Sequence, residues 1–138
     1  MIAPDFTVET LDGQYITLSE LQGKIVMIDF WSSWCPPCRI EASQLGKVFN
    51  SYQGSDVEFI GVAIWDQKQE VKEFVRIHNV PYINALDNDG IIAIDYGVRG
   101  IPEKYFINKN GYIVKKFIGP LDSNKLEEIL DLLLFESQ

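Results

Sequence analysis

Two cysteines separated by two residues are the side chains with the clearest chemistry in this sequence. They lie in the segment Trp34-Cys35-Pro36-Pro37-Cys38, directly after an apolar stretch and at the start of a pattern typical of a helix. Such a position favours a thiolate at Cys35, because the first amide groups of a helix carry partial positive charge. Cys38, one turn further on, can attack a mixed disulfide formed on Cys35. The spacing therefore predicts thiol-disulfide exchange, with Cys35 as the nucleophile and Cys38 as the resolving cysteine.

Other uses of the cysteine pair are less well supported. A structural disulfide would close a very small loop and add little stability by the chain-entropy argument. A zinc site needs about four ligands, and the chain's one histidine, His78, does not complete such a set. Thiolates also suit Cu(I), so a copper-binding module stays an alternative, although Met1 and Met27 form no ligand cluster with the pair. We expect no metal and no cofactor besides the redox-active disulfide Cys35–Cys38.

The two prolines between the cysteines suggest the direction of the reaction. Backbone amides at the start of a helix normally donate to a sulfur at the cap position, but proline has no N–H. With proline at positions 36 and 37, the amide of Cys38 is the one that remains among the nearest donors to Cys35. A less stabilised thiolate makes the disulfide harder to reduce. We therefore expect a reductant and not a strong oxidant.

Strand and helix patterns alternate on both sides of the cysteines. A buried strand is predicted at residues 24–31, a helix at 36–52, and a hairpin within residues 6–18. Further strands are predicted at residues 57–65, 82–86, 104–107 and 112–118, and further helices at residues 67–78, 91–96 and 121–135. This alternation is typical of an α/β fold with a central mixed sheet flanked by helices. The length fits a single domain, residues 1–138.

Charge and hydropathy limit the partners. The net charge of −8 argues against a nucleic-acid partner, because phosphate binding needs a basic surface. The longest apolar stretch stays below the roughly 18 residues that span a bilayer, and the N-terminus has no pattern of a secretory signal. We expect a monomer with no membrane contact by this domain.

Residues 29–38, which read DFWSSWCPPC, resemble the active-site strand and loop of the thioredoxin superfamily. Ile101-Pro102 resembles the cis-proline that faces the cysteine pair in that fold. The resemblance implies that the backbone beside Pro102 pairs with an extended substrate, in the manner of an added strand. It also implies that Trp34, Pro36 and Pro37 contact the substrate together with Ile101 and Pro102.

A closer resemblance is to the TlpA/ResA/DsbE group of extracytoplasmic thiol reductases. Residues 3–24 resemble the N-terminal hairpin of that group, and residues 96–103 and 118–121 are most similar to its cytochrome c maturation branch. Pro102 lies 64 positions after Cys38, a distance that fits the inserted βα unit of the group. The resemblance implies a thioredoxin fold with an N-terminal β-hairpin and this inserted unit.

The same resemblance implies particular partners and a compartment. The clients would be proteins with thiols or disulfides, apocytochrome c among them, and an upstream dithiol would return electrons. The full-length protein would be extracytoplasmic, in the periplasm or on the outer face of the membrane, and exported or membrane-anchored. A cytoplasmic location stays the alternative, because the sequence contains no signal or anchor.

Two carboxylates are candidates for proton transfer at the cysteines. Glu41 lies three residues after Cys38 on the predicted helix and matches the acidic residue that the group keeps near its cysteines. Asp29 matches the buried aspartate of thioredoxin, where the group often has asparagine. Burial would raise the pKa of Asp29 and allow it to accept the proton of Cys38. The competing interpretations are a hydrogen-bonded polar residue at a strand bend for Asp29 and a solvated helix face for Glu41.

A peroxiredoxin-like peroxidase is the other enzymatic alternative. Its N-terminal hairpin is similar, and Ser32 precedes Cys35 in a Ser-x-x-Cys spacing. However, Ile28 occupies the position where that motif has proline, and the continuation through Cys38 is thioredoxin-like.

Overall fold

The central strand of the molecule leads directly to the cysteines. In the computed structural model, which describes residues 1–137, β3 (Ile25–Trp31) is buried along its whole length. β4 (Val57–Ala63) pairs with it in parallel and β6 (Glu103–Ile107) pairs with it antiparallel. β5 (Ile83–Leu86) and β7 (Ile113–Ile118) complete a five-stranded sheet of order β5-β4-β3-β6-β7. This is the central mixed sheet that the sequence predicts.

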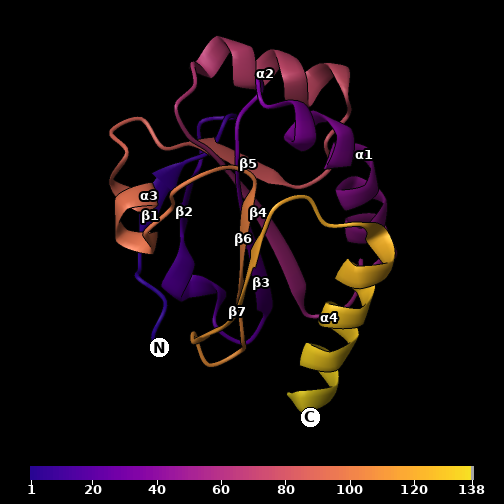
Figure 1. Ribbon diagram of the computed structural model, residues 1–138. Helices are drawn as coiled ribbons and strands as arrows, with labels where there is room; N and C mark the ends of the chain where they lie inside the picture. Colours follow the sequence, from indigo (N-terminus) through magenta and orange to yellow (C-terminus); the bar gives the residue numbers. More distant parts are fainter. Residues whose placement is uncertain (138) are drawn as a thin grey trace.

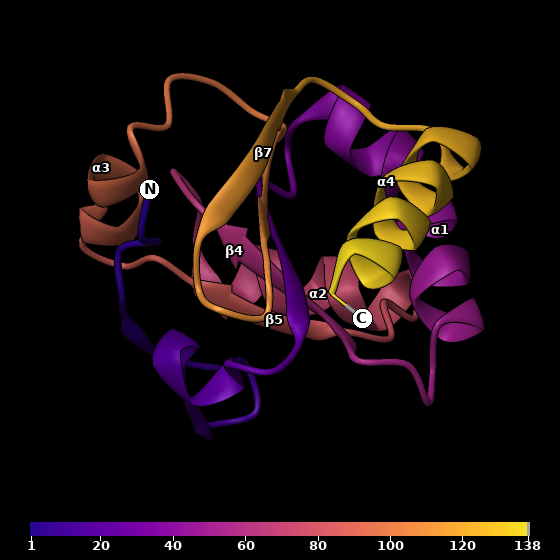
Figure 2. The same ribbon diagram turned by 90° about the horizontal axis from the view of Figure 1, so that it is seen from below.

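Helices cover both faces of the sheet (Figures 1 and 2). α1 (Pro36–Ser51) and α4 (Ser123–Glu136) lie side by side on one face. The other face carries α3 (Ile91–Tyr96), the hairpin of β1 (Thr7–Glu9) and β2 (Tyr15–Thr17), and the short 3-10 helix η1 (Leu18–Leu21). α2 (Lys68–Ile77) packs near β5 at the end of the sheet where α1 begins. The predicted N-terminal hairpin is therefore confirmed. Along the chain, β5 and α3 come after α2 and before Pro102.

Side chains of β3 alternate between the two faces, as strand geometry requires. Ile25 and Met27 enter the apolar layer under α1 and α4, whereas the intervening Val26 and Ile28 enter the layer under α3 and the hairpin. Asp29 follows the first pattern and is therefore directed to the α1/α4 side. A buried carboxyl group thus lies on the face where the preceding residues of β3 place apolar side chains.

Most element boundaries lie within two residues of the prediction, and the differences have local causes. β4 ends at Ala63 instead of 65, because Trp65 adopts a left-handed backbone with φ of 54° that cannot continue a strand. α4 begins at Ser123 instead of 121, since the carboxylate of Asp122 accepts a hydrogen bond from the amide of Lys125 at 2.8 Å and so caps the helix. Within residues 1–137, none of the helices combines the length and the apolar character needed to cross a membrane.

Candidate functional site

The cysteine pair forms a disulfide at the N-terminus of α1. Cys35 is the N-cap residue, bonded through sulfur to Cys38, and both residues are 3% exposed. The amide of Cys38 donates to the Sγ atom of Cys35 at 3.4 Å. Pro36 and Pro37 occupy the first two helical positions, where an ordinary residue would offer further amide groups. The donor that the sequence predicts for Cys35 is the one observed.

The predicted proline faces this disulfide across the sheet end. The Ile101–Pro102 peptide bond is cis, and the carbonyl oxygen of Ile101 lies 4.0 Å from Sγ of Cys35. Buried Glu103 holds the preceding loop, because its Oε2 accepts hydrogen bonds from the amides of Arg99 and Gly100, each at 3.1 Å. The sequence did not predict this anchoring role, since one carboxylate after a proline looks the same as a surface residue.

Exposed aromatic and proline side chains form the approach to the sulfurs. Trp34 is 56% exposed, and its Nε1 donates to the carbonyl oxygen of Trp65 at 2.9 Å. Pro36 is exposed, Pro37 and Ile101 are half-buried, and Pro102 is buried. Trp34, Pro36 and Pro37 therefore flank the cysteines along the chain with accessible surface, and the Ile101 carbonyl lies near Cys35, whereas Pro102 itself offers little surface.

A groove of about 670 Å³ adjoins Trp34 between the active-site loop and α2. Its apolar lining includes Trp65, which is 55% exposed, and Phe74. The guanidinium of Arg39 lies 5.4 Å from the centre of the Phe74 ring. The rim also carries two carboxylates of α2, those of Glu70 and Glu73. The sequence did not assign Trp65 to the site, because its place at the groove depends on how α2 packs.

Trp31 packs in the same buried cluster as the two cysteines. It is buried, and its Nε1 donates to Oδ1 of Asn84 on β5 at 2.9 Å. Gly61 on the intervening strand β4 makes this bond possible: a Cβ atom there would lie 2.0 Å from the same Asn84 oxygen and 3.0 Å from Nε1 of Trp31. The Trp31 ring also packs against Phe74, with centroids 5.2 Å apart. Trp31 is therefore a core residue that supports the active-site loop from below.

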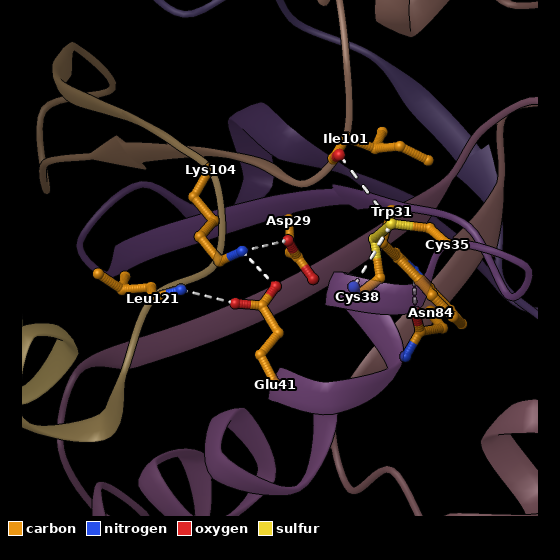
Figure 3. A network of polar contacts seen from close by, with 9 residues as sticks. All are labelled: Asp29, Trp31, Cys35, Cys38, Glu41, Asn84, Ile101, Lys104 and Leu121. Atoms are coloured by element: carbon orange, nitrogen blue, oxygen red, sulfur yellow. Dashed lines mark hydrogen bonds and ion pairs between the residues drawn. A yellow bond between two sulfur atoms is a disulfide. The ribbon is translucent and has the colours of Figure 1, made fainter.

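Both candidate carboxylates are buried, and a lysine that the sequence did not single out lies between them (Figure 3). Nζ of Lys104 is 3.1 Å from Oδ1 of Asp29 and bonds to Oε1 of Glu41. Oε2 of Glu41 accepts from the amide of Leu121 at 2.8 Å. The solvated-helix interpretation of Glu41 is therefore wrong, because α4 and β6 cover that side of α1.

The three buried charges change one another's proton affinity. Burial raises the pKa of Asp29, although the charge of Lys104 opposes the change. Burial, together with the charge of Asp29, raises the pKa of Glu41 to about 7, again against Lys104. Burial disfavours the charged form of Lys104, but the two carboxylates outweigh this and its pKa is raised. Glu41 can therefore take up or release a proton near neutral pH, in contact with the same ammonium group as Asp29.

This chain is similar in sequence and in fold to known proteins over most of its length. Residues 1–116 match the AhpC/TSA family. The thiol-disulfide oxidoreductase ResA of Halalkalibacterium halodurans is 35% identical over 132 residues, which are 95% of this chain and 74% of the relative. The structure of MTB dsbF is 32% identical with a TM-score of 0.86, over 93% of this chain and 94% of that one. A thioredoxin family thiol:disulfide interchange protein from Chlorobium tepidum TLS has the same fold, with a TM-score of 0.91 at 24% identity over 97% and 96% of the two chains. The chain therefore belongs to the AhpC/TSA family and, within it, to the ResA-like thiol-disulfide oxidoreductases with a thioredoxin fold.

Proposed function

We propose that this protein reduces disulfides in protein clients, with electrons carried by the Cys35–Cys38 pair and no further cofactor. The observation that supports this direction most is the hydrogen bonding at Cys35. Its sulfur receives one helix amide, that of Cys38 at 3.4 Å, because the residue at the second helical position, Pro37, has no N–H to donate. A thiolate with few donors is a comparatively unstable product of reduction, so the dithiol gives up its electrons readily.

The reaction would proceed in two exchange steps. The Cys35 thiolate attacks a client disulfide, which forms a Cys35–client bond and releases one client thiolate. The thiolate of Cys38 then attacks Sγ of Cys35, forms the intramolecular disulfide and releases the second client thiol. The cysteine pair loses two electrons and the client gains them. A carboxylate of the Asp29 and Glu41 pair accepts the proton of Cys38 before the second attack.

The client would lie in an extended conformation over the exposed rim of the site. Its backbone would pair beside Ile101, whose carbonyl oxygen is 4.0 Å from Cys35, while Trp34, Pro36 and Pro37 contact its side chains. The residues that flank the client cysteine would occupy the groove at Trp65. Carboxylates on the rim of this groove favour clients with basic residues there.

The remaining partners follow from the same chemistry. An upstream dithiol must return two electrons after each turnover, because the reaction leaves the pair as a disulfide. We propose that the domain works as a monomer outside the cytoplasm, within an exported or membrane-anchored protein. Apocytochrome c, with its paired cysteines, is the client that we would test first.

The first experiment is the redox potential of the Cys35–Cys38 pair, measured at equilibrium against glutathione or dithiothreitol with tryptophan fluorescence as the signal. We expect one two-electron transition below about −200 mV, in the range of thioredoxin and glutaredoxins. A potential near the roughly −120 mV of DsbA would contradict the proposed direction.

Trapping a client provides the second measurement. Cys38→Ala should accumulate a mixed disulfide with a peptide that contains an oxidised Cys-x-x-Cys-His segment, whereas Cys35→Ala should not. Consumption of tert-butyl hydroperoxide by the reduced protein, at a rate similar to that of peptide reduction, would instead favour the peroxidase alternative.

A further inference from the structure

Lys104 is a fully buried charge that the exchange reaction described above does not use. It lies on β6 directly opposite Asp29 in the antiparallel register with β3, and its side chain is 0% exposed. A buried ammonium costs free energy unless it is paired. Its two partners, Asp29 and Glu41, are the two carboxylates proposed to accept the proton of Cys38, so the lysine has its counter-ions at the site itself.

The two carboxylates are held differently. Glu41 has a donor on each oxygen, Nζ of Lys104 on one and the amide of Leu121 on the other. Asp29 has Lys104 near its Oδ1 atom at 3.1 Å, without a well-directed hydrogen bond to that oxygen from the described residues. Two donors stabilise the ionised form of Glu41 more than one ion pair stabilises that of Asp29.

Asp29 is also the carboxyl group that faces the resolving cysteine. A small cavity of about 10 Å³ is lined by Asp29 and Cys38, together with Trp31, Tyr82 and other residues, and neither Glu41 nor Lys104 lines it. In Figure 3, Asp29 lies between the Lys104 ammonium and Cys38. The groups that face Asp29 are thus Lys104 from β6, Cys38 and Glu41 from α1, and Tyr82 from the segment before β5.

We propose that Lys104 is a positioning residue that sets the proton affinity of Asp29 by binding Asp29 and Glu41 at once. The inference rests on the proposed function, since it concerns the second exchange step. With Lys104 charged, the cluster has one positive and up to two negative charges. An opposite charge at this distance lowers the pKa of a carboxyl group, and a like charge raises it. Lys104 therefore lowers the pKa of Asp29 against the effect of burial and favours the carboxylate form that can accept the proton of Cys38, whereas the charge of Glu41 has the opposite effect.

The proton balance is complete within this site. Asp29 in its carboxylate form takes the proton of the Cys38 thiol, and the resulting thiolate attacks Sγ of Cys35. The bond between Cys35 and the client breaks, the client sulfur leaves with the bonding electrons, and it receives a proton from Asp29 or from water. Lys104 exchanges no proton in this step and changes only the pH at which Asp29 can act.

The two exchange steps can be followed separately, because each of them releases one coloured thiolate. The reduced protein is mixed in a stopped-flow instrument with 5,5′-dithiobis(2-nitrobenzoate) between pH 5 and 10. The first thionitrobenzoate reports attack by Cys35, and the second reports displacement by Cys38. When the rate of the second release is plotted against pH, we expect it to rise with pH. Lys104→Met should move this rising limb to higher pH by roughly 1 to 3 units, the effect of removing an adjacent opposite charge.

Substitution of Glu41 should shift the pH dependence of the second rate in the opposite direction. Glu41→Gln removes a like charge and should move the limb to lower pH, and the double variant, in which one charge of each sign is lost, should return it toward that of the unmodified protein. Lys115→Met, an equal charge change on exposed β7, is the matched control and should leave the limb in place.

The outcomes distinguish the two proposals. Absence of a second release in the unmodified protein contradicts the exchange mechanism itself. Two releases with an unshifted limb in Lys104→Met overturn the role of Lys104. Shifts of the same sign in Lys104→Met and Glu41→Gln would show that both residues act only by supporting the fold. If Lys104→Met does not fold, the downward shift in Glu41→Gln still tests the charge argument, because a zero or upward shift refutes it.

Discussion

Restoring one backbone amide beside Cys35 should make this protein a stronger oxidant. Cys35 is the N-cap of α1, and an N-cap side chain accepts from the amides of the second and third helical residues. The third is Cys38, which donates at 3.4 Å. The second is Pro37, which has no N–H to donate. Pro37→Ala supplies this missing donor, whereas Pro36→Ala adds an amide at the first helical position, which does not face the cap side chain.

The size of the effect follows from the strength of one hydrogen bond to a charged acceptor. Such a bond contributes about 1.5–3 kcal/mol, and we take about 1.5 kcal/mol because sulfur is a weak acceptor. For a two-electron couple, 1.4 kcal/mol corresponds to about 30 mV. Pro37→Ala should therefore raise the potential by about 30 mV and lower the pKa of Cys35 by roughly one unit.

The pH of the measurement matters for this prediction. The added amide stabilises the thiolate far more than the thiol, so the full shift is present only where reduced Cys35 is ionised. Equilibrium with dithiothreitol at pH 9.5, above the ordinary cysteine pKa of about 8.5, should give the full shift, and the same measurement at pH 7 should give a smaller one. Alkylation of Cys35 with iodoacetamide across the same pH range gives its pKa independently.

Pro36→Ala is the matched control, because it removes the same ring and adds the same freedom to the unfolded chain. Its potential should stay within about 10 mV of the unmodified protein, well below the change expected from one hydrogen bond to a thiolate. Equal shifts in the two variants, or a lower potential in Pro37→Ala, would refute the explanation based on missing amides. The proposed preference for reduction would then need another cause.

Three other substitutions test separate parts of the structure. Gly61→Ala should destabilise the fold by about 2 kcal/mol in urea denaturation, because overpacking costs roughly 1–3 kcal/mol and the new Cβ would lie 2.0 Å from the Asn84 oxygen. Unchanged stability would mean that the Trp31–Asn84 hydrogen bond is dispensable. Trp65→Ala should raise the KM for a client peptide about tenfold with the redox potential unchanged, since a contact of about 1.4 kcal/mol corresponds to a factor of ten; an unchanged KM would place the client elsewhere. The pKa of Glu41 is raised on folding to about 7, so the folded protein binds a proton there more tightly than the unfolded chain does. Because the unfolded state ionises first, the free energy of unfolding should fall as pH rises from about 4.5 to 7. Glu41→Gln should lack this fall. Parallel pH curves for the two proteins would show that Glu41 is not perturbed.

The fold and the redox pair could be predicted from the sequence because their signals are local. Cys35 and Cys38 lie close together through their spacing alone, and a proline pair at a helix start acts on the nearest sulfur whatever surrounds it. Strand and helix periods predict the elements around them, since side-chain direction repeats every two residues in a strand and every 3.6 residues in a helix. The boundary errors came from single residues, such as Trp65 with its left-handed backbone.

The charge cluster depended on tertiary structure. Asp29, Glu41 and Lys104 belong to three different elements. The sequence singled out the two carboxylates as candidates, but Lys104 looks ordinary in its own segment. Only the register of β3 with β6 puts Lys104 opposite Asp29, and only the packing of α4 over α1 excludes water from Glu41. A pKa depends on distance and burial in three dimensions. The sequence thus predicted the two cysteines and the two candidate carboxylates, whereas the tertiary structure decided that Lys104 lies between these carboxylates and that water is excluded from them.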